Sequence, residues 1–416
     1  MSNVTRLPGP IAEVWDWQRN GACRGRDSAQ FFHPDGERGA SRARRESAAK
    51  AVCITCPVRA ECAAHALAAK EPYGVWGGFT ETERLRLLAT GWEDAAERGR
   101  YRVDVRRLGF ARDTASPPAL WRNIRAFARL VRELRAIRPD VLHTFLFRSY
   151  VVGPPAARLA AVPVVVAGRR NQSDYKRGRR WVFTVERTAT LITDHIVANA
   201  VAVLEDTRTV ERVPAHKLSV IYNGLPDEVF DAVTPAEIHA DRPVLVCVAN
   251  FKRQKGHTYL LRAAAELARR GRPCTLVLVG DGPNRPALEA QAKTLGLDAR
   301  FLGRRADHER LLARADVVVL SSLFEGMSNA VMEAMALGRP IVATAVGGTP
   351  ELLDGRGVLV PAADPRALAD GIARVLENPE PAAALGAEAR GWARKNLDVR
   401  RMVDEHVHLY RRLLED

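Results

Sequence analysis

The chain has 416 residues, of which 47% are hydrophobic and 27% are charged, and its formal net charge is +14. This composition is typical of soluble globular proteins and excludes a disordered, collagenous or coiled-coil chain, and the length predicts about two to four domains. The longest apolar stretch, residues 156–168, contains Arg158 and is shorter than the ~18 residues of a membrane-spanning helix. The N-terminus lacks the apolar core of a signal peptide, so we expect a cytoplasmic protein.

Four cysteines lie near the N-terminus with the spacing C-x29-C-x2-C-x5-C. These candidate metal ligands are Cys23, Cys53, Cys56 and Cys62. In a cytoplasmic chain, clustered cysteines are more often metal ligands than disulfide partners. Structural zinc modules usually contain two close pairs of ligands, whereas this sequence has one. The spacing therefore favours an iron–sulfur cluster, with zinc and redox-active thiols as alternatives.

The residues around these cysteines form a set of linked motifs. They are WDWQRNGACRG, FFHPDGERG, AKAVCITCPVRAECAAHAL and the turn GVWGG. From Trp15 to Leu88 the chain resembles the WhiB-like family of actinobacterial regulators. The resemblance implies that the four cysteines bind one 4Fe–4S cluster and that the protein regulates transcription in response to redox state or nitric oxide. It also implies that the apo form can form disulfides and bind DNA.

The segment after the GVWGG turn differs from the basic tail with which members of that family contact DNA. It reads FTETERLRLLATGWEDAAERGR and contains Arg84 and Arg86, but no dense run of Lys and Arg. Because phosphate contacts dominate non-specific affinity for DNA, this segment predicts little DNA binding by the module alone.

The pattern changes near residues 93–102 to apolar runs that alternate with amphipathic helices, which is typical of a parallel α/β sheet. Continuous runs such as DVVVL indicate strands that are buried on both faces. Strands are predicted at Val141–Phe145, Pro163–Ala167, His195–Asn199, Leu218–Tyr222, Val244–Ala249, Thr275–Gly280, Val317–Ser321, Pro340–Ala343 and Gly357–Val360. Helices are predicted at Leu120–Ile137, Tyr259–Arg270, Arg285–Leu295 and Asn329–Ala336.

Nearly all of the excess positive charge lies in residues 101–190, which contain 19 Lys and Arg against 6 Asp and Glu. The densest part is GRRNQSDYKRGRRW. Such a surface can hold a phosphorylated acceptor, contact an anionic membrane at its periphery or supply phosphate contacts to DNA. A solvated face without a ligand is the alternative.

The segment DVVVLSSLFEGMSNAVMEAMAL places a loop between a buried strand and a helix. Ligands of open α/β sheets bind beyond the carboxyl ends of the strands, and the start of a helix suits a diphosphate. Gly326 permits close approach of the backbone to such a ligand. Glu325 and Glu333 can accept hydrogen bonds from hydroxyls at opposite ends of one donor. The amides that face the diphosphate belong to Met327, Ser328 and Asn329.

From Tyr101 to the end, the chain resembles the family 4 glycosyltransferases, which have the GT-B architecture of two Rossmann domains. The segments that carry this resemblance include RPDVLHTFLF, LSVIYNGLP, VANFKRQKGH, LVGDGP and the block that contains Glu325 and Glu333. The resemblance implies a retaining transfer from a nucleotide sugar. It places Glu325 at the donor sugar, as a catalytic residue, and Glu333 at the ribose.

The same resemblance assigns further contacts to the donor. Lys252 and Lys255 would bind the phosphates of the donor, and the backbone at Gly280 would approach the base of the donor. Many family members have Arg where this chain has Asn250. No D-x-D pair occurs in the chain, so we expect no divalent metal in transfer.

The acceptor half is truncated in comparison with the family. The opening strand, Gly-rich loop, helix and second strand are missing, and the cysteine-bearing region stands in their place. We expect the sheet to be poorly ordered or to repack, because the missing first strand is central in the family. His143 matches a family position near the transferred sugar and is a candidate catalytic residue, while a second His often seen two residues later is Phe145 here.

The sequence thus predicts an α/β protein in which a small all-α iron–sulfur module precedes GT-B-type double Rossmann domains, the first of them truncated. The hypothesis is a fused regulator and glycosyltransferase-like region, and the alternative is a joined reading frame in which one half functions. The expected divisions are a module at 1–92, a linker at 93–101, an acceptor-side domain at 102–225, a donor domain at 226–395 and a C-terminal helix at 396–416 that crosses back.

Overall fold

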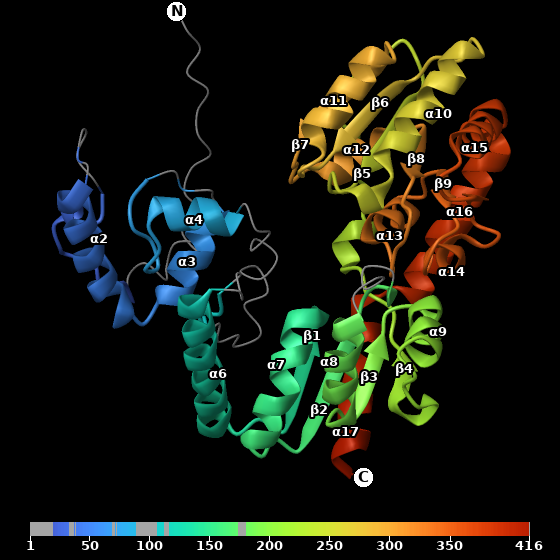
Figure 1. The fold of residues 1–416 in the computed structure, drawn as a ribbon. Helices are drawn as coiled ribbons and strands as arrows, with labels where there is room; N and C mark the ends of the chain where they lie inside the picture. The colour runs from blue at the N-terminus through green and yellow to red at the C-terminus, as the bar shows by residue number, and fades with distance from the viewer. Residues whose placement is uncertain are drawn as a thin grey trace, which may run out of the picture. The chain divides into compact units, whose positions relative to one another are not determined.

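The computed structural model describes residues 20–32, 37, 39–68, 71, 73–88, 106–111, 116–173 and 180–415. The chain forms two compact units, residues 1–107 and 108–416 (Figure 1). The expected linker and the basic residues 174–179 lie outside the described part of the chain. None of the helices in the described part has both the length and the apolar character needed to cross a membrane.

The described elements of the first unit are helices. They are a 3-10 helix, Ser28–Gln30, and the α-helices α2 (Gly39–Ile54), α3 (Arg59–Ala68) and α4 (Glu81–Leu88). Helix α4 begins at a capping box, in which the Thr80 hydroxyl accepts from the Glu83 amide and the Glu83 carboxylate accepts from the Thr80 amide. A small core joins α2 to the flanking loops through Phe31, Ala49, Val52, Cys53 and Val75.

The second unit begins with a parallel four-stranded sheet in the order β1-β2-β3-β4. Its strands are β1 (Val141–Phe145), β2 (Val164–Arg169), β3 (His195–Ala198) and β4 (Leu218–Val220). Strand β1 is an edge strand among the described residues, and it pairs with β2 along its whole length. The expectation of a poorly ordered or repacked sheet is therefore wrong for these strands. Most of β1 is half-buried, so its free edge is less apolar than a fully buried central strand would be.

One helix precedes the strands of this sheet and three helices connect them. They are α6 (Pro117–Ile137), α7 (Leu146–Leu159), α8 (Arg180–Leu191) and α9 (Val201–Thr209). Helix α7 packs against β1 and β2 although it contains Pro154 and Pro155. The sequence did not predict it, because two prolines remove amide donors and normally interrupt a helix. Its buried face, which includes Tyr150, Ala156 and Ala157, holds the segment against the sheet.

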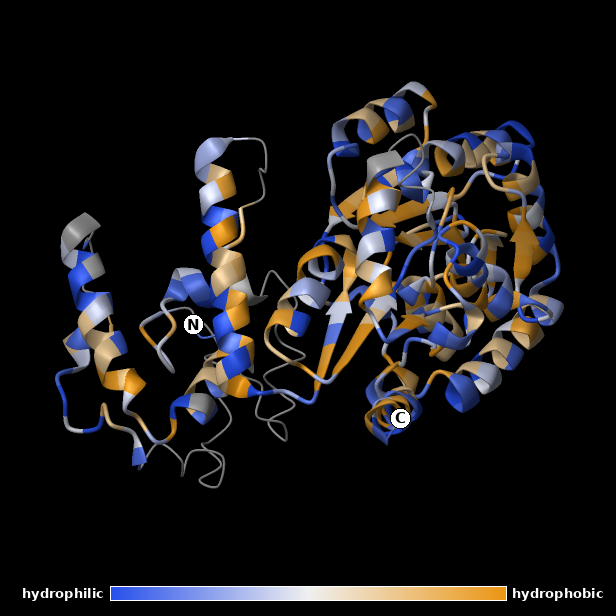
Figure 2. Ribbon diagram, turned by 60° about the horizontal axis from the view of Figure 1, so that its bottom comes forward, coloured by the Kyte–Doolittle hydropathy of each residue, from blue (hydrophilic) through white to orange (hydrophobic). Residues whose placement is uncertain are grey.

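The second sheet has six parallel strands in the order β10-β9-β8-β5-β6-β7. They are β5 (Val244–Val248), β6 (Thr275–Val279), β7 (Asp298–Gly303), β8 (Val317–Leu320), β9 (Ile341–Thr344) and β10 (Val358–Val360). The sequence did not predict β7, because this half-buried edge strand contains Asp298 and Arg300 and has no continuous apolar run. The strands of this unit are predominantly hydrophobic, while its outer helices mix hydrophobic and hydrophilic residues (Figure 2).

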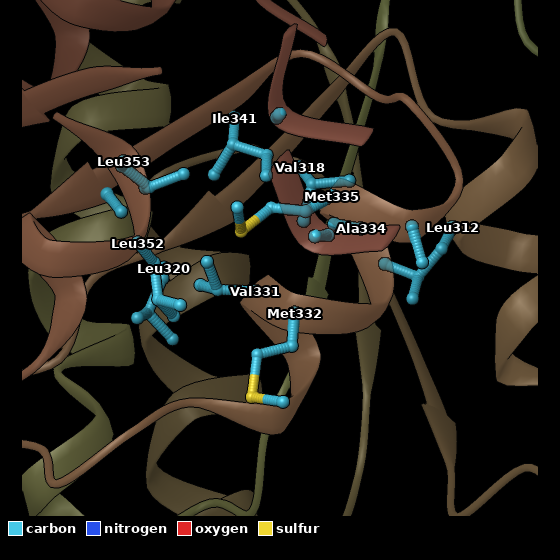
Figure 3. Close-up of a cluster of buried hydrophobic side chains, with 14 of the residues drawn as sticks. Leu312, Val318, Leu320, Val331, Met332, Ala334, Met335, Ile341, Leu352 and Leu353 are labelled. Atoms are coloured by element: carbon cyan, nitrogen blue, oxygen red, sulfur yellow. The ribbon is translucent and has the colours of Figure 1, made fainter. Parts of the chain in front are cut away.

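Helices cover both faces of the second sheet. They are α10 (His257–Arg269), α11 (Arg285–Thr294), α12 (His308–Arg314), α13 (Asn329–Ala336), α14 (Thr349–Leu353), α15 (Pro365–Glu377) and α16 (Pro379–Asn396). Most residues of helix α13 are buried, and Val331, Met332 and Met335 pack among leucine and isoleucine side chains of the neighbouring elements (Figure 3). This packing fixes the start of α13 at the carboxyl end of β8.

The last helix, α17 (Val399–Glu415), packs against the first sheet. Leu409 is buried with Val164 and Val166 of β2. The chain reaches that sheet through a parallel bridge between Leu225 and Asp398. The two sheets of the second unit are therefore joined at two points of the chain, near residue 225 and near residue 398.

Candidate functional sites

The four N-terminal cysteines line one cavity of about 480 Å³. Cys53 lies on α2, Cys62 lies on α3, and Cys56 lies in the turn between these helices. Cys23 lies in the loop before the 3-10 helix and is the most exposed of the four. All four are free thiols. The fold thus brings Cys23, which is distant in the sequence, to the same cavity as the three cysteines of α2, α3 and the turn between them.

The cavity suits a group of several atoms better than a single ion. A structural zinc site needs four ligands that converge on one point at about 2.0–2.3 Å. Among the described residues, no three His, Cys, Asp or Glu side chains are placed to hold one ion. The cysteines instead surround a volume, as the thiolate ligands of an iron–sulfur cluster do.

Backbone amides already point at two of these sulfur atoms. The Ala22 amide donates to Cys56 Sγ at 3.3 Å, and the Gly77 amide donates to Cys62 Sγ at 3.1 Å. Burial raises the pKa of the Cys62 thiol to about 11, although the Gly77 amide opposes this shift. Hydrogen bonds of this kind stabilise thiolates and tune bound clusters. The GVWGG turn therefore contributes directly to the cysteine site.

Arg84 supports this turn from beneath. Its guanidinium is 2% exposed and donates to the backbone carbonyls of residues 71, 73, 74 and 79 at 2.7–3.0 Å. The sequence analysis grouped Arg84 with Arg86 as positive charge available to DNA, and the structure corrects this for Arg84. A buried side chain with four carbonyl partners cannot reach a phosphate, so it acts as a structural clamp on the turn.

We expect the substitution Arg84→Met to destabilise the turn by about 2–4 kcal/mol, because buried carbonyls lose their hydrogen-bond partners. Hydrogen exchange of the amides of residues 73–79 measures the effect, and these amides should exchange faster in the variant. Arg44→Met is the matched control, since Arg44 is exposed on α2. Equal exchange rates in wild type and Arg84→Met would contradict the clamp.

The second candidate site is a cavity of about 630 Å³ at the carboxyl ends of strands from both sheets. It is lined by most of the predicted donor-site residues: Lys255, Gly280, Glu325, Met327, Ser328, Asn329 and Glu333. Residues of the first sheet also line it: Arg170, Asn199 and Asn223. Lys252 is not among the lining residues, because it lies in a separate, smaller cavity beside α10.

Glu325 is buried at the base of this cavity, with 4% of its surface exposed. Its carboxylate forms an ion pair with Lys255 and accepts a hydrogen bond of 2.6 Å from the Ser322 hydroxyl. Glu333 lies one to two turns into α13 and contacts His308 Nε2 at 3.2 Å. This hydrogen bond raises the pKa of His308. The two carboxylates thus face the same cavity with different basic partners.

Two glycines are required by close backbone contacts. A side chain at Gly326 would meet the Arg170 carbonyl oxygen at 1.9 Å, although Gly326 itself does not line the cavity. Gly280 has a φ of +144°, and a side chain there would meet the Ala249 carbonyl oxygen at 2.0 Å. Both glycines therefore permit chain segments to approach at the edges of the cavity.

Comparison with known proteins identifies the N-terminal region. Residues 17–87 match the sequence profile of the family described as "Transcription factor WhiB". Over 88 residues, the chain is 67% identical to the transcriptional regulator WhiD of Streptomyces coelicolor. This match covers 21% of this chain and 79% of that protein. The redox-responsive transcriptional regulator WhiB3 of Mycolicibacterium smegmatis is 59% identical over 91 residues, or 22% of this chain and 95% of that protein.

The chain belongs to the WhiB family. The WhiB module, residues 17–87, includes all four cysteines and the GVWGG turn, and the predicted resemblance is confirmed.

The rest of the chain is similar to glycosyltransferases. Residues 83–229 match the profile "Glycosyltransferase Family 4", and residues 242–378 match "Glycosyl transferases group 1". The alpha-D-kanosaminyltransferase of Streptomyces kanamyceticus is 34% identical over 207 residues, which cover 45% of this chain. The chain spans 54% of that relative.

Solved structures show the same fold. HepE of Anabaena, in complex with UDP-glucose, superposes with a TM-score of 0.62 at 23% identity, over 68% of this chain and 81% of that one. Sucrose-phosphate synthase of Thermosynechococcus elongatus superposes with a TM-score of 0.61 over 70% and 78% of the two chains. The protein is therefore a WhiB-type transcriptional regulator fused to a glycosyltransferase region with GT-B-like Rossmann sheets, as predicted.

In the glycosyltransferase region, His143 lies beside the donor cavity and not in its lining. Its Nδ1 contacts the Tyr410 hydroxyl at 2.6 Å, and its ring stacks on Phe145 with centroids 4.1 Å apart. Burial lowers the pKa of His143 to about 3. At neutral pH the ring is therefore uncharged, and its contacts favour packing and positioning over proton transfer.

Several residues that line the 630 Å³ cavity were not predicted from the sequence: Arg170, Asn199, Asn223, Arg304, Arg305 and His308. Arg170, Asn199, Asn223 and Arg304 follow closely on the ends of strands, so the rule that ligands bind beyond strand ends could have found them. Neighbouring arginines of the basic segment also differ in their exposure. Arg169 is buried in an ion pair with Glu211, and it is therefore not available to a phosphate.

Proposed function

We propose that the WhiB module holds one 4Fe–4S cluster on Cys23, Cys53, Cys56 and Cys62 and regulates transcription in the cytoplasm in response to redox state or nitric oxide. The observation that carries this proposal is the single cavity lined by all four thiols in a WhiB-family module. The cluster supplies a reversible one-electron centre with oxidant-sensitive bonds. Its loss would leave four thiols, which can pair as disulfides in the apo form.

The chain's own residues set the behaviour of this site. The Gly77 and Ala22 amides would stabilise the ligating sulfur atoms of Cys62 and Cys56. Because burial keeps the Cys62 thiol protonated at neutral pH, binding of iron must release its proton. DNA binding by the apo form would use basic residues other than Arg84, since Arg84 is committed to the turn.

We further propose that the cavity of the glycosyltransferase region binds a nucleotide sugar, the donor of a retaining transfer, and that the truncated acceptor side leaves the transfer itself weak or absent. Glu325, held by Lys255 and Ser322, would contact the donor sugar, and Glu333 would contact the ribose. The free amides at the start of α13 would face the diphosphate. This charge is met by amides and side chains, so the proposed site uses no divalent metal. A phosphorylated or lipid acceptor, presented at a membrane surface, would approach from the first sheet.

Binding of UDP to the full chain in the absence of magnesium tests this assignment. We expect Glu333→Ala to weaken the binding by about 1–3 kcal/mol, because the ribose hydroxyls lose an acceptor. Isothermal titration calorimetry measures the affinity, and Glu388→Ala on the exposed face of α16 is the matched control. Binding that requires magnesium, or equal affinities for wild type and Glu333→Ala, would argue against the assignment.

A further inference from the structure

Most of the basic side chains around the donor cavity have a carboxylate partner. The pairs are Lys255 with Glu325, Arg305 with Asp307, and His308 with Glu333. In the described part of the chain, two other cations line the cavity without an ion-pair partner, and these are Arg170 and Arg304. A diphosphate in this cavity would therefore draw its countercharge chiefly from these two side chains and from the start of α13.

Arg170 comes from the first sheet, directly after β2. Its guanidinium donates to the Asn223 side-chain oxygen at 2.8 Å and lies 5.0 Å from the centre of the Phe145 ring. Both partners are uncharged, and burial lowers the pKa of Arg170 with no carboxylate to oppose the shift. A half-buried cation held by neutral groups retains its capacity to bind an anion.

Arg170 also lies at the end of the cavity where α13 begins. Its carbonyl oxygen packs against Gly326, three residues before α13 begins, and Asn223 donates to the side chain of Asn329 at the first turn of α13. Arg304 follows β7, which is three strands away from β8, or about 14 Å at the usual strand spacing. The start of α13, where a diphosphate is most favourable, is therefore next to the backbone of Arg170, whereas Arg304 follows a strand at the far edge of the second sheet.

One residue on the second sheet's side of the cavity brings no charge to it. Asn250 follows β5 and lines the donor cavity, but its side chain carries no charge. Lys252, two residues further on, lines a different cavity. On the opposite side of the cavity, Arg170 carries a charge that has no carboxylate partner.

We propose that Arg170, at the end of a strand of the acceptor-side sheet, binds the donor diphosphate and supplies a charge that Asn250, on the other side of the cavity, does not. This inference rests on the proposed nucleotide-sugar site. It makes donor binding depend on both sheets, because the phosphates would be held between Arg170 and the amides of α13. The guanidinium is planar and can donate two parallel hydrogen bonds to phosphate oxygens.

The test compares UDP with uridine, which lacks the phosphates, as ligands of the full-length protein. Wild type should bind UDP more tightly than uridine. In Arg170→Gln we expect the affinity for UDP to fall about tenfold or more, the loss of a charge-assisted hydrogen bond, with uridine affinity unchanged. Adding Asn250→Arg to this variant should restore much of the UDP affinity. Arg304→Gln, which removes the other unpaired cation, should have the smaller effect on the difference between the two ligands.

The possible failures are distinguishable. If wild type binds neither UDP nor uridine, the proposed donor site itself is wrong. If wild type binds UDP and Arg170→Gln binds it equally well, the donor site stands and the role of Arg170 is overturned. Equal loss of UDP and uridine affinity, or no recovery with Asn250→Arg, would show that Arg170 merely positions Asn223, and would also overturn the proposal. Thermal unfolding of each variant confirms that the protein is folded.

Discussion

Replacing Cys23, Cys53, Cys56 or Cys62 with Ser, one at a time, should remove most of the iron from protein purified without oxygen. Wild type should be brown and contain about four irons per chain, since thiolates hold clusters of this type. The four sulfur atoms surround one cavity, and the serine hydroxyl is a much poorer ligand for iron. Iron content per chain and the visible absorption spectrum measure the effect.

Cys274→Ala is the control for this experiment, because Cys274 is a buried thiol of the glycosyltransferase region. Its iron content should equal that of wild type. Removal of Cys62 should have a second effect that removal of Cys23 does not have. Cys62 is half-buried and accepts a hydrogen bond from the Gly77 amide, whereas Cys23 is exposed. The Cys62 variant should therefore also lose a contact with the GVWGG turn. One zinc per chain in place of iron would contradict the cluster assignment.

Full-length protein should show little or no sugar transfer even when the donor site binds UDP. Retaining transfer requires the acceptor hydroxyl to be held within near-attack distance of the donor's anomeric carbon, and an error of ~1 Å can cost 10²-fold in rate. The four described strands of the first sheet leave β1 at its edge, and the sequence predicts that the strand and Gly-rich loop which precede this strand in family members are missing. His143 packs against Tyr410 and Phe145 beside the cavity and does not reach into it.

The experiment measures donor turnover by anaerobic full-length protein and by a chimera in which the strand, loop, helix and strand are restored from a complete homologue. We expect a nearly silent parent and an active chimera, with similar UDP affinity in both. Equal UDP affinity separates loss of acceptor positioning from loss of donor binding. Robust transfer by the parent would show that the existing sheet positions an acceptor without those elements.

Several features of this protein were determined by the sequence itself. The cysteine spacing and the GVWGG turn identified the WhiB module, and residues 317–336 predicted the strand, loop and helix of the proposed donor site. Strand β1 and helix α13 were predicted with the bounds that the structure has. These features depend on local spacing, apolar runs and helix starts, which are all present in a short stretch of chain.

Other features were decided by tertiary structure, because they depend on contacts between distant segments. Arg84 and Arg86 are the same residue type in the same segment. In the fold, however, the Arg84 side chain is buried against the GVWGG turn and holds it by hydrogen bonds. Lys252 and Lys255 lie three residues apart, yet the short 3-10 helix at Arg253–Lys255 turns only Lys255 toward Glu325.

Arg170 is the clearest case. Its sequence context is a basic segment, in which Arg169 and Arg170 are indistinguishable by composition. Strand β2 places successive side chains on opposite faces, so Arg169 is buried against Glu211, whereas Arg170, just past the end of the strand, faces the donor cavity. Two features decide which arginine faces the cavity: the alternation of side chains along β2 and the position of the second sheet next to its end. Neither feature follows from the residue type.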